Sequence, residues 1–242
     1  MRLILIALFL LVFSIVSLPL YLAAWLLGKK DEKLQVAFSQ KIVKAGFRII
    51  FFIAGVKIDC RGVERVPKDE PIMYIGNHRS YCDILAGYIT VPTLTGFVSK
   101  DDLAKVPCIS RWMKFLKCLF LDRKNPKEGL KTILQGIEQI KRGLSIFIMP
   151  EGTRNHNEDV TDLLPFHDGS FKLSTKTGCA IVPVAMKNTD KVIRKKFPWI
   201  KPANIVLEYG EPVYPADLSA EEKKRIGNYM QEKVKEMLEN LE

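Results

Sequence analysis

The sequence lacks the cysteine and histidine patterns of disulfide-bonded and zinc-binding proteins. Its five cysteines are scattered, odd in number and without C-x-x-C spacing, which argues against a disulfide framework and favours a reducing, cytosolic environment. The three histidines, His78, His156 and His167, are too few and too dispersed for a histidine-rich metal centre, so we expect no metal site. No internal repeat and no long Ser, Gly or Pro linker divides the 242 residues, and this length fits one domain with attachments.

Acidic residues are in the minority. The chain has 37 Lys and Arg against 27 Asp and Glu, a net charge of +10, which by itself fits a nucleic-acid partner as well as a lipid surface. No nucleic-acid-binding motif accompanies this charge, and much of it lies beside the apolar N-terminus. We therefore expect anionic membrane lipids, and no nucleic acid, among the partners.

The N-terminal segment is a long apolar run. Residues 3–27 carry no charge and are numerous enough to cross a hydrocarbon core of about 30 Å. A cleaved signal peptide is the competing interpretation. The run exceeds a typical signal-peptide core, however, and no small-residue cleavage site precedes Lys29-Lys30. A membrane helix, spanning or embedded in one leaflet, is the prediction.

A second amphipathic helix is expected over residues 33–56. Apolar residues dominate it, while Lys41, Lys44 and Arg48 fall on one face at helical spacing. Such a stripe can be a solvated face of a helix packed on a core, but cations beside apolar bulk fit a helix lying at anionic headgroups better. We expect residues 1–56 to be membrane-associated helices, with an α/β domain, residues 57–242, on the cytosolic face of the cell membrane.

Beyond residue 56, strand-like and helical patterns alternate. This alternation predicts an α/β domain with a layered sheet flanked by helices. In the last helix, Ile226, Met230, Val234, Met237 and Leu241 form a stripe that we interpret as core packing. The strand-like runs lie near residues 72–76, 96–99, 118–121, 144–149, 180–185 and 203–209, and the helical patterns at 101–116, 126–142 and 219–241.

The run from Asn77 to Asp83 offers the best candidate for a general base. A neutral histidine accepts a proton near pH 7, and a carboxylate on its other ring nitrogen fixes the tautomer. Residues five apart do not face each other on a straight helix, but Ser80-x-x-Asp83 resembles a capping box. His78 would then lie in the loop before the helix and turn back towards Asp83. The alternative is that Asp83 only caps the helix and His78 is an ordinary loop residue.

Two further strand-like runs end in charged residues. Residues 144–149 lead into Pro150-Glu151-Gly152-Thr153-Arg154, where a glycine allows close backbone approach, a hydroxyl can bond a ligand and a guanidinium suits phosphate. Residues 118–121 lead into Asp122-Arg123, and Lys100 ends the run at 96–99. Each signal is weak alone, but together they indicate an anion-binding site at the strand ends.

These segments, in this order, resemble the bacterial 1-acyl-sn-glycerol-3-phosphate acyltransferases of the glycerolipid acyltransferase superfamily. Asn77-His78 with Asp83 is similar to the N-H-x-x-x-x-D block, residues 120–123 to F-I-D-R, and residues 150–154 to P-E-G-T-R. Residues 181–185 are similar to the fourth, apolar block. The resemblance covers roughly residues 56–213. One departure is Lys117, where the family commonly has a glycine, which puts the local backbone shape in question.

The resemblance implies acyl transfer to the free hydroxyl of lysophosphatidic acid, giving phosphatidic acid. His78 would be the base and Asp83 would orient it. Arg123 and Arg154 would bind the phosphate, with Glu151, Gly152 and Thr153 shaping the loop and Lys100 as a further phosphate ligand. No cofactor is expected, and acyl-CoA or acyl carrier protein would be the co-substrate. Acylation of another lysophospholipid or of glycerol-3-phosphate stays open, as does a non-catalytic lipid-binding module, against which the intact His78 and Asp83 argue.

Overall fold

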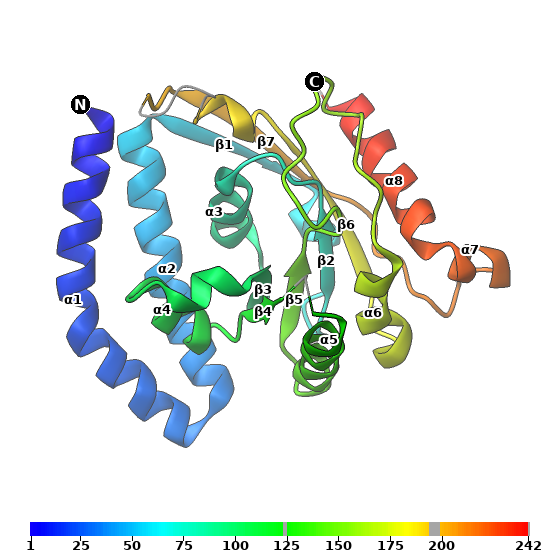
Figure 1. Cartoon of the computed structure of the whole chain (residues 1–242), viewed down its shortest axis with the longest axis horizontal. Helices are drawn as coiled ribbons and strands as arrows, with labels where there is room; N and C mark the ends of the chain where they lie inside the picture. Colours follow the sequence, from blue (N-terminus) through cyan, green and yellow to red (C-terminus); the bar gives the residue numbers. More distant parts are fainter. Residues whose placement is uncertain (123–124, 194–198, 242) are drawn as a thin grey trace.

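The computed structural model describes residues 1–122, 125–193 and 199–241. Its centre is a seven-stranded sheet in the order β1-β7-β6-β2-β5-β3-β4, and helices cover both faces (Figure 1). The predicted α/β class is confirmed. The strands are β1 (Val56–Arg61), β2 (Met73–Gly76), β3 (Thr95–Lys100), β4 (Leu119–Leu121), β5 (Ser145–Ile148), β6 (Ile181–Lys187) and β7 (Ala203–Tyr209).

All neighbouring strands pair in parallel except β6 and β7, which are antiparallel. Strand β2 lies between β5 and β6, and its four residues are all buried. Because β2, β5, β3 and β4 are consecutive and parallel, their carboxyl ends lie at one edge of the sheet. Ligands bind at this kind of edge in α/β folds.

The helices form two layers. Those on one face share a core cluster with Tyr74 and Phe147, and those on the other share a cluster with Met73 and Ile75, as the alternation of side chains along β2 requires. The first layer contains α1 (Arg2–Lys30), α2 (Glu32–Ala54), α3 (Tyr81–Thr90) and α4 (Ile109–Phe115), and the second contains α5 (Pro126–Lys141), α6 (Lys172–Thr177) and α8 (Ile226–Asn240), which follows α7 (Ala220–Lys224).

Stacked aromatic rings fill the core beneath α3. Phe147 of β5 stacks on Phe97 of β3 with ring centroids 4.6 Å apart, and Phe97 stacks on Tyr88 of α3 at 4.1 Å. Tyr74 of β2 continues the series at 5.7 Å from Phe147. Offset aromatic pairs add about 0.5–1.5 kcal/mol beyond their burial. This stack fixes α3, which carries Asp83, over the strands that lead into the candidate site.

Three expected elements differ in the structure. The helix expected over residues 33–56 ends at Ala54, because Gly55 adopts a left-handed φ of +74°. The chain then enters strand β1 at Val56, a strand that the sequence did not predict. The helix expected over residues 101–116 is broken near Pro107, which cannot donate a backbone hydrogen bond, into the 3₁₀ helix η2 (Asp101–Lys105) and α4. The helix expected over 219–241 is divided at Arg225.

The stripe predicted on the last helix does pack in the core. Ile226, Met230, Val234 and Leu241 are buried and Met237 is partly buried. The boundary between a membrane-associated part and a catalytic part at residue 56 stays a prediction, since α2 packs closely against α3 and α4.

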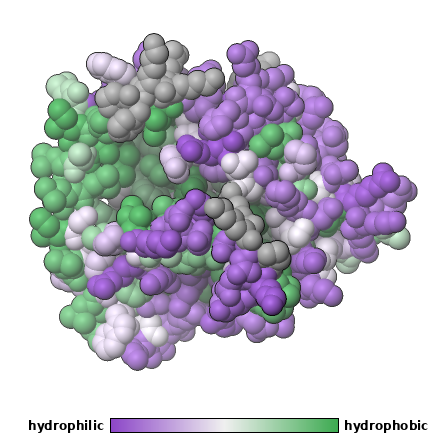
Figure 2. Space-filling view, viewed as in Figure 1, coloured by the Kyte–Doolittle hydropathy of each residue, from purple (hydrophilic) through white to green (hydrophobic). Residues whose placement is uncertain are grey.

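Helix α1 is long and apolar enough to cross a membrane by length and composition, although signal sequences meet the same criterion. It bends along its length in Figure 1 and contains Pro19, which removes one backbone hydrogen bond. Its inner side contacts α4, where Trp112 Nε1 donates to Ser17 Oγ at 3.0 Å and the Tyr21 hydroxyl donates to the Cys108 carbonyl at 3.1 Å. Figure 2 shows the apolar surface gathered over the side where α1 and α2 lie.

The cationic stripe on α2 is divided between two environments. Lys41 and Arg48 are exposed, but the Lys44 ammonium is partly buried and donates to the Val91 carbonyl at the end of α3 at 2.5 Å. Burial, reinforced by Arg48, lowers the pKa of Lys44 to about 8. Lys44 therefore joins α2 to the catalytic layer, and only Lys41 and Arg48 of the three are free to face a membrane surface.

Lys117, the departure noted from the pattern that the sequence resembles, adopts a φ of +57°. Side chains other than glycine pay about 1–2 kcal/mol for this left-handed conformation. Its ammonium pairs with Glu32 at the start of α2 at 2.9 Å. The departure from glycine thus leaves the turn in its glycine-like shape and adds a contact to α2.

We predict that Lys117→Gly is more stable than Lys117→Ala by about 1 kcal/mol. Both changes remove the ion pair with Glu32, and only alanine keeps the strained backbone. Glycine is therefore expected to be the more stabilising of the two here, although alanine usually stabilises a folded protein more than glycine does. Melting temperatures of the two variants in the same detergent check this. A higher melting temperature for the alanine variant would show that the turn relaxes to a negative φ.

Candidate active site

The predicted site residues come from adjacent strand ends. His78 follows β2 after Gly76 and Asn77, the segment from Glu151 to Arg154 follows β5, and Lys100 is the last residue of β3. Strand β4, next to β3, leads towards Arg123, which lies outside the described residues. The topology therefore brings segments that are far apart in the sequence to one edge of the sheet.

His78 and Asp83 are in direct contact. His78 Nδ1 lies 2.8 Å from Asp83 Oδ2, and the side chains of His78 and Asp83 are 13% and 0% exposed. An ionised carboxylate only accepts hydrogen bonds, so this contact requires a proton on Nδ1 and leaves Nε2 as the acceptor in the neutral ring. The loop conformation that the sequence predicted for His78 is therefore the observed one.

Asp83 also caps α3. Its Oδ2 accepts from the backbone N–H groups of Arg79 and Ser80, both at 2.7 Å, while the Ser80 hydroxyl accepts from the Cys82 N–H. The predicted capping box is present. The alternatives of a capping residue and an orienting carboxylate are thus combined in one side chain. The helix cap holds the carboxylate still, and the carboxylate holds the imidazole.

The loop after β5 makes hydrogen bonds to both the backbone N–H and the backbone carbonyl of His78. Glu151 Oε1 accepts from the His78 N–H at 2.7 Å, and the Asn155 N–H donates to the His78 carbonyl at 2.6 Å. The other oxygen of Glu151 accepts from the Leu164 N–H at 3.0 Å. Burial raises the pKa of Glu151, opposed by these hydrogen bonds. Glu151 thus fixes the position of His78, a contact that the sequence did not reveal, and its predicted part in substrate binding stays a prediction.

Asn77 joins the same loop to the neighbouring strand β6. Its amide donates to the Met186 carbonyl at 2.9 Å and its oxygen accepts from the Met186 N–H at 2.8 Å. Asn77 is fully buried, and both partners of its amide are backbone groups of β6. The residue before His78 is therefore fixed to β6 as firmly as a strand residue would be.

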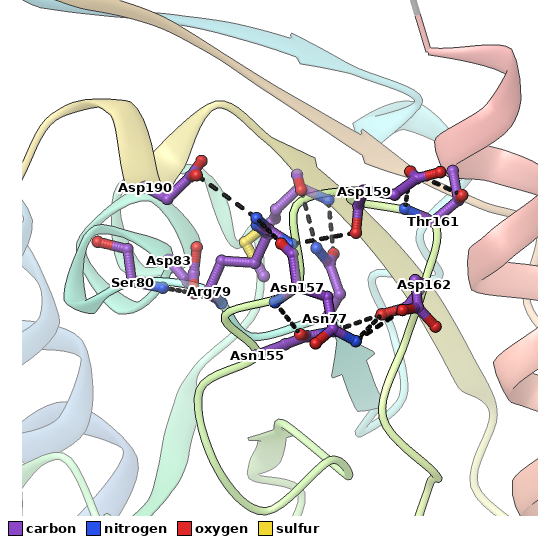
Figure 3. A network of polar contacts seen from close by, with 11 residues as sticks. Asn77, Arg79, Ser80, Asp83, Asn155, Asn157, Asp159, Thr161, Asp162 and Asp190 are labelled. Carbon is purple, nitrogen blue, oxygen red and sulfur yellow. Dashed lines mark hydrogen bonds and ion pairs between the residues drawn. The ribbon is translucent and has the colours of Figure 1, made fainter. Parts of the chain in front are cut away.

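Arg79 is the main site residue that sequence reasoning missed. Its guanidinium donates to the carbonyl of Asn157 at 2.6 Å and of Asp159 at 3.3 Å, and lies 3.5 Å from a carboxylate oxygen of Asp190. Figure 3 shows the Arg79 side chain extending from the loop after β2 towards the segment of Asn157 and Asp159 and towards Asp190. Its side chain is 8% exposed. A buried arginine directly after the candidate base is the only signal that the sequence offered.

A cleft of about 960 Å³ opens over the site. Its polar side is lined by His78, Lys100 and residues 151–154, so the structure brings the described site candidates together, with Asp83 behind His78. Gly152 adopts a φ of +72° and approaches the ring of His167, which a Cβ at this position would meet at 3.1 Å. Glycine is thus required here by the turn itself, in addition to any ligand.

The basic groups of the cleft differ in their surroundings. The Arg154 guanidinium lies over the ring of Tyr81 at 4.4 Å from its centroid, a cation–π contact that orients its fork. Lys100 pairs with Asp102, so its charge is partly neutralised. Thr153 is exposed. Within the described ranges no group of three or more His, Cys, Asp or Glu side chains could hold a metal ion, and the expectation of a metal-free site stays a prediction.

Comparison with known proteins agrees with this geometry. The sequence profile of the Acyltransferase family matches residues 57–187. A 1-acyl-sn-glycerol-3-phosphate acyltransferase of Borreliella burgdorferi is 26% identical over 83% of this chain and 79% of its own length. One of Saccharomyces cerevisiae is 28% identical over 81% of this chain and 63% of its own length, so the match leaves more than a third of the yeast protein uncovered.

A solved structure is similar over almost the whole chain. It is the crystal structure of the 1-acyl-sn-glycerophosphate (LPA) acyltransferase PlsC from Thermotoga maritima, with a TM-score of 0.75, 26% identity and coverage of 99% of this chain and 97% of that one. The similarity includes the N-terminal helices as well as the sheet. The family profile spans more than half of this chain and contains the candidate site from Asn77 to Arg154. The resemblance indicated by the four sequence blocks is confirmed, and the chain belongs to the Acyltransferase family.

Proposed function

We propose that this protein transfers a fatty acyl group from a thioester to the free hydroxyl of a 1-acyl-glycerol-3-phosphate and so forms phosphatidic acid. The observation that carries the proposal is the His78–Asp83 pair, at 2.8 Å, on the wall of a cleft that Arg154 also lines. The names of the related proteins give the same reaction. The proposed donor is acyl-CoA or acyl carrier protein.

The proton movements follow from the geometry of His78. With Asp83 on Nδ1, the Nε2 atom takes the proton of the acceptor hydroxyl as its oxygen attacks the thioester carbonyl. The new C–O bond forms, the C–S bond breaks, and the imidazolium returns its proton to the leaving thiolate. Asp83 stabilises the imidazolium between these steps. A protein nucleophile is unnecessary, because the thioester is already activated.

The phosphate of the acceptor is assigned to Arg154, together with Arg123. Arg154 presents a guanidinium fork held over Tyr81, and such a fork can bind phosphate through two parallel hydrogen bonds. Lys100 and the Thr153 hydroxyl are secondary ligands on the same cleft. Opposite them the cleft has apolar walls, including Leu119, Ile133 and Leu173, which suit hydrocarbon chains.

We further propose that α1 and α2 hold the enzyme on one face of the cell membrane, with the catalytic domain in the cytosol. Large apolar side chains of α1 such as Ile4, Leu11 and Leu18 are more than 60% exposed, whereas soluble proteins rarely expose contiguous apolar patches of this kind. The lipid acceptor lives at that boundary. Holding hydroxyl and thioester together there supplies part of the rate by orientation.

The first test removes the base. His78→Ala should lower turnover of lysophosphatidic acid by about 10²–10⁴-fold, and Asp83→Asn should lower it as well, because an amide at residue 83 favours the wrong imidazole tautomer. Formation of radiolabelled phosphatidic acid by purified protein measures both.

Ser80→Ala is the matched control, since it removes the helix cap and leaves the His78–Asp83 contact in place. It should reduce stability by about 1 kcal/mol while turnover stays far above that of the His78 variant. Near-normal turnover by folded His78→Ala protein would exclude the proposed mechanism.

The second test concerns the phosphate. Arg154→Ala should reduce the use of lysophosphatidic acid far more than that of a neutral monoacylglycerol, because only the charged acceptor loses a charge-assisted contact, typically worth about 1.5–3 kcal/mol. Arg154→Lys should fall between, since an ammonium keeps the charge without the fork. Ratios of kcat/KM for the two acceptors measure the effect, and equal losses on both acceptors would show that Arg154 does not bind the acceptor phosphate.

The third test concerns α2. Lys41→Glu with Arg48→Glu should weaken binding to vesicles rich in anionic lipid, more so at low salt, where charges are less screened. Lys44→Met should instead lower the melting temperature and change vesicle binding little, because Lys44 bonds Val91. Unchanged vesicle binding by the double variant at low salt would show that this face of α2 meets solvent or protein.

A further inference from the structure

A second cavity adjoins the catalytic cleft. It measures about 830 Å³ and shares Tyr81 and Arg154 with the cleft in its lining, whereas His78 lines only the cleft. Its other wall comes from the 3₁₀ helix η4 (Thr189–Lys191) and the described residues that follow it, including Trp199 and Lys201. We call this second cavity the η4 groove. The stacked pair of Arg154 and Tyr81 lies where cleft and groove meet.

The η4 groove carries surplus positive charge. Asp190 is the carboxylate among its described lining residues, and it is already engaged by the Arg79 guanidinium at 3.5 Å. Lys191 and Lys201 are exposed, and in the described part of the chain neither has an ion pair with an acidic side chain. Together with Arg154 they leave the groove cationic. Such a surface favours a ligand with several negative charges.

An exposed aromatic ring lies among these cations. The Trp199 side chain is 68% exposed and lines the groove beside Ile193, which is 38% exposed. An exposed aromatic face next to cations is an arrangement on which nucleobases stack. Aromatic stacking and phosphate binding are thus available in one cavity.

We propose that the η4 groove binds the adenine- and phosphate-bearing end of coenzyme A in the acyl donor. This inference rests on the proposed function and makes the donor specific. In coenzyme A a pantetheine arm separates the thioester from the phosphates and the base. The nucleotide end should therefore bind in a cavity that adjoins the cleft of His78 without being lined by His78, as the η4 groove does. The acceptor phosphate, in contrast, is only a glycerol away from the reacting hydroxyl and belongs near Arg154 in the cleft.

Comparing two acyl donors tests whether the η4 groove binds the nucleotide end of coenzyme A. Palmitoyl-CoA carries the nucleotide, and palmitoyl-pantetheine presents the same thioester without base or phosphates. In Trp199→Ala, and in Lys191→Ala with Lys201→Ala, the KM for palmitoyl-CoA should rise by at least about fivefold, the low end for loss of one stacked base, while kcat/KM for palmitoyl-pantetheine stays within twofold. Trp199→Phe should restore most of the affinity, because phenylalanine keeps an aromatic face.

Lys223→Ala with Lys224→Ala is the charge-matched control on α7, which lines neither cavity, and it should leave both donors unaffected. Equal effects of the groove variants on the two donors would overturn the proposal. Reduced binding to phosphatidylglycerol vesicles with no difference between donors would assign Trp199 to a lipid contact instead. The proposal would also be overturned if the unaltered protein used acylated acyl carrier protein as donor but did not use palmitoyl-CoA.

Binding of free coenzyme A, measured by calorimetry on the full chain in detergent, gives a readout that does not depend on turnover. Binding to the unaltered protein that is lost in the groove variants supports the proposal. If that binding is seen but no phosphatidic acid forms with any donor, the proposed function fails and the groove assignment stands. If the unaltered protein makes phosphatidic acid and the groove variants bind coenzyme A normally, the groove assignment alone fails.

Discussion

The candidate site depends on one buried carboxylate oxygen, Asp83 Oδ2. This atom accepts from the imidazole of His78 and from two consecutive backbone N–H groups. A fully buried charge is costly unless it is hydrogen-bonded. The other oxygen of Asp83, Oδ1, is buried without a hydrogen-bond partner, so the bonds of Oδ2 must offset that cost, and they form only when the loop has one particular shape. The need to satisfy the carboxylate therefore selects the loop conformation, and the loop conformation places His78. The cap of α3 and the position of His78 therefore depend on the same oxygen atom.

The sheet determines what can surround that loop. Strand β2 leads into the loop of His78. It lies between β5, whose following loop supplies Glu151 and Arg154, and β6, to which Asn77 is hydrogen-bonded. Parallel pairing requires these segments to end at the same edge. The N-terminal helices are joined to the same framework, since Lys44 of α2 bonds the end of α3 and Trp112 of α4 bonds α1. The N-terminal helices and the helix that carries Asp83 are parts of one packed layer.

The sequence was sufficient for local features and insufficient for contacts at long range. The capping box at Ser80 and Asp83 involves neighbouring residues, so its spacing predicts its geometry. The strand ends were legible from hydrophobic runs followed by charged residues. Nothing local indicates that Glu151 bonds the backbone of His78, or that Arg79 reaches Asn157, because both contacts depend on strand order. Likewise Lys44 fits the surface stripe by its spacing, and only the packing of α2 on α3 reveals that its ammonium is partly buried.

The two hydrogen bonds from the loop after β5 to the backbone of His78 affect how sequence variation in this family is interpreted. Glu151 and Asn155 hold the N–H and the carbonyl of the same residue, although the two segments are 73 positions apart between His78 and Glu151. A substitution at either position removes one of the two hydrogen bonds that fix the backbone of His78. In a mutational scan, losses at residues 151 and 154 would look alike, although Glu151 bonds the backbone of His78 whereas Arg154 lines the cleft. Covariation between the first and third blocks is expected to record the former.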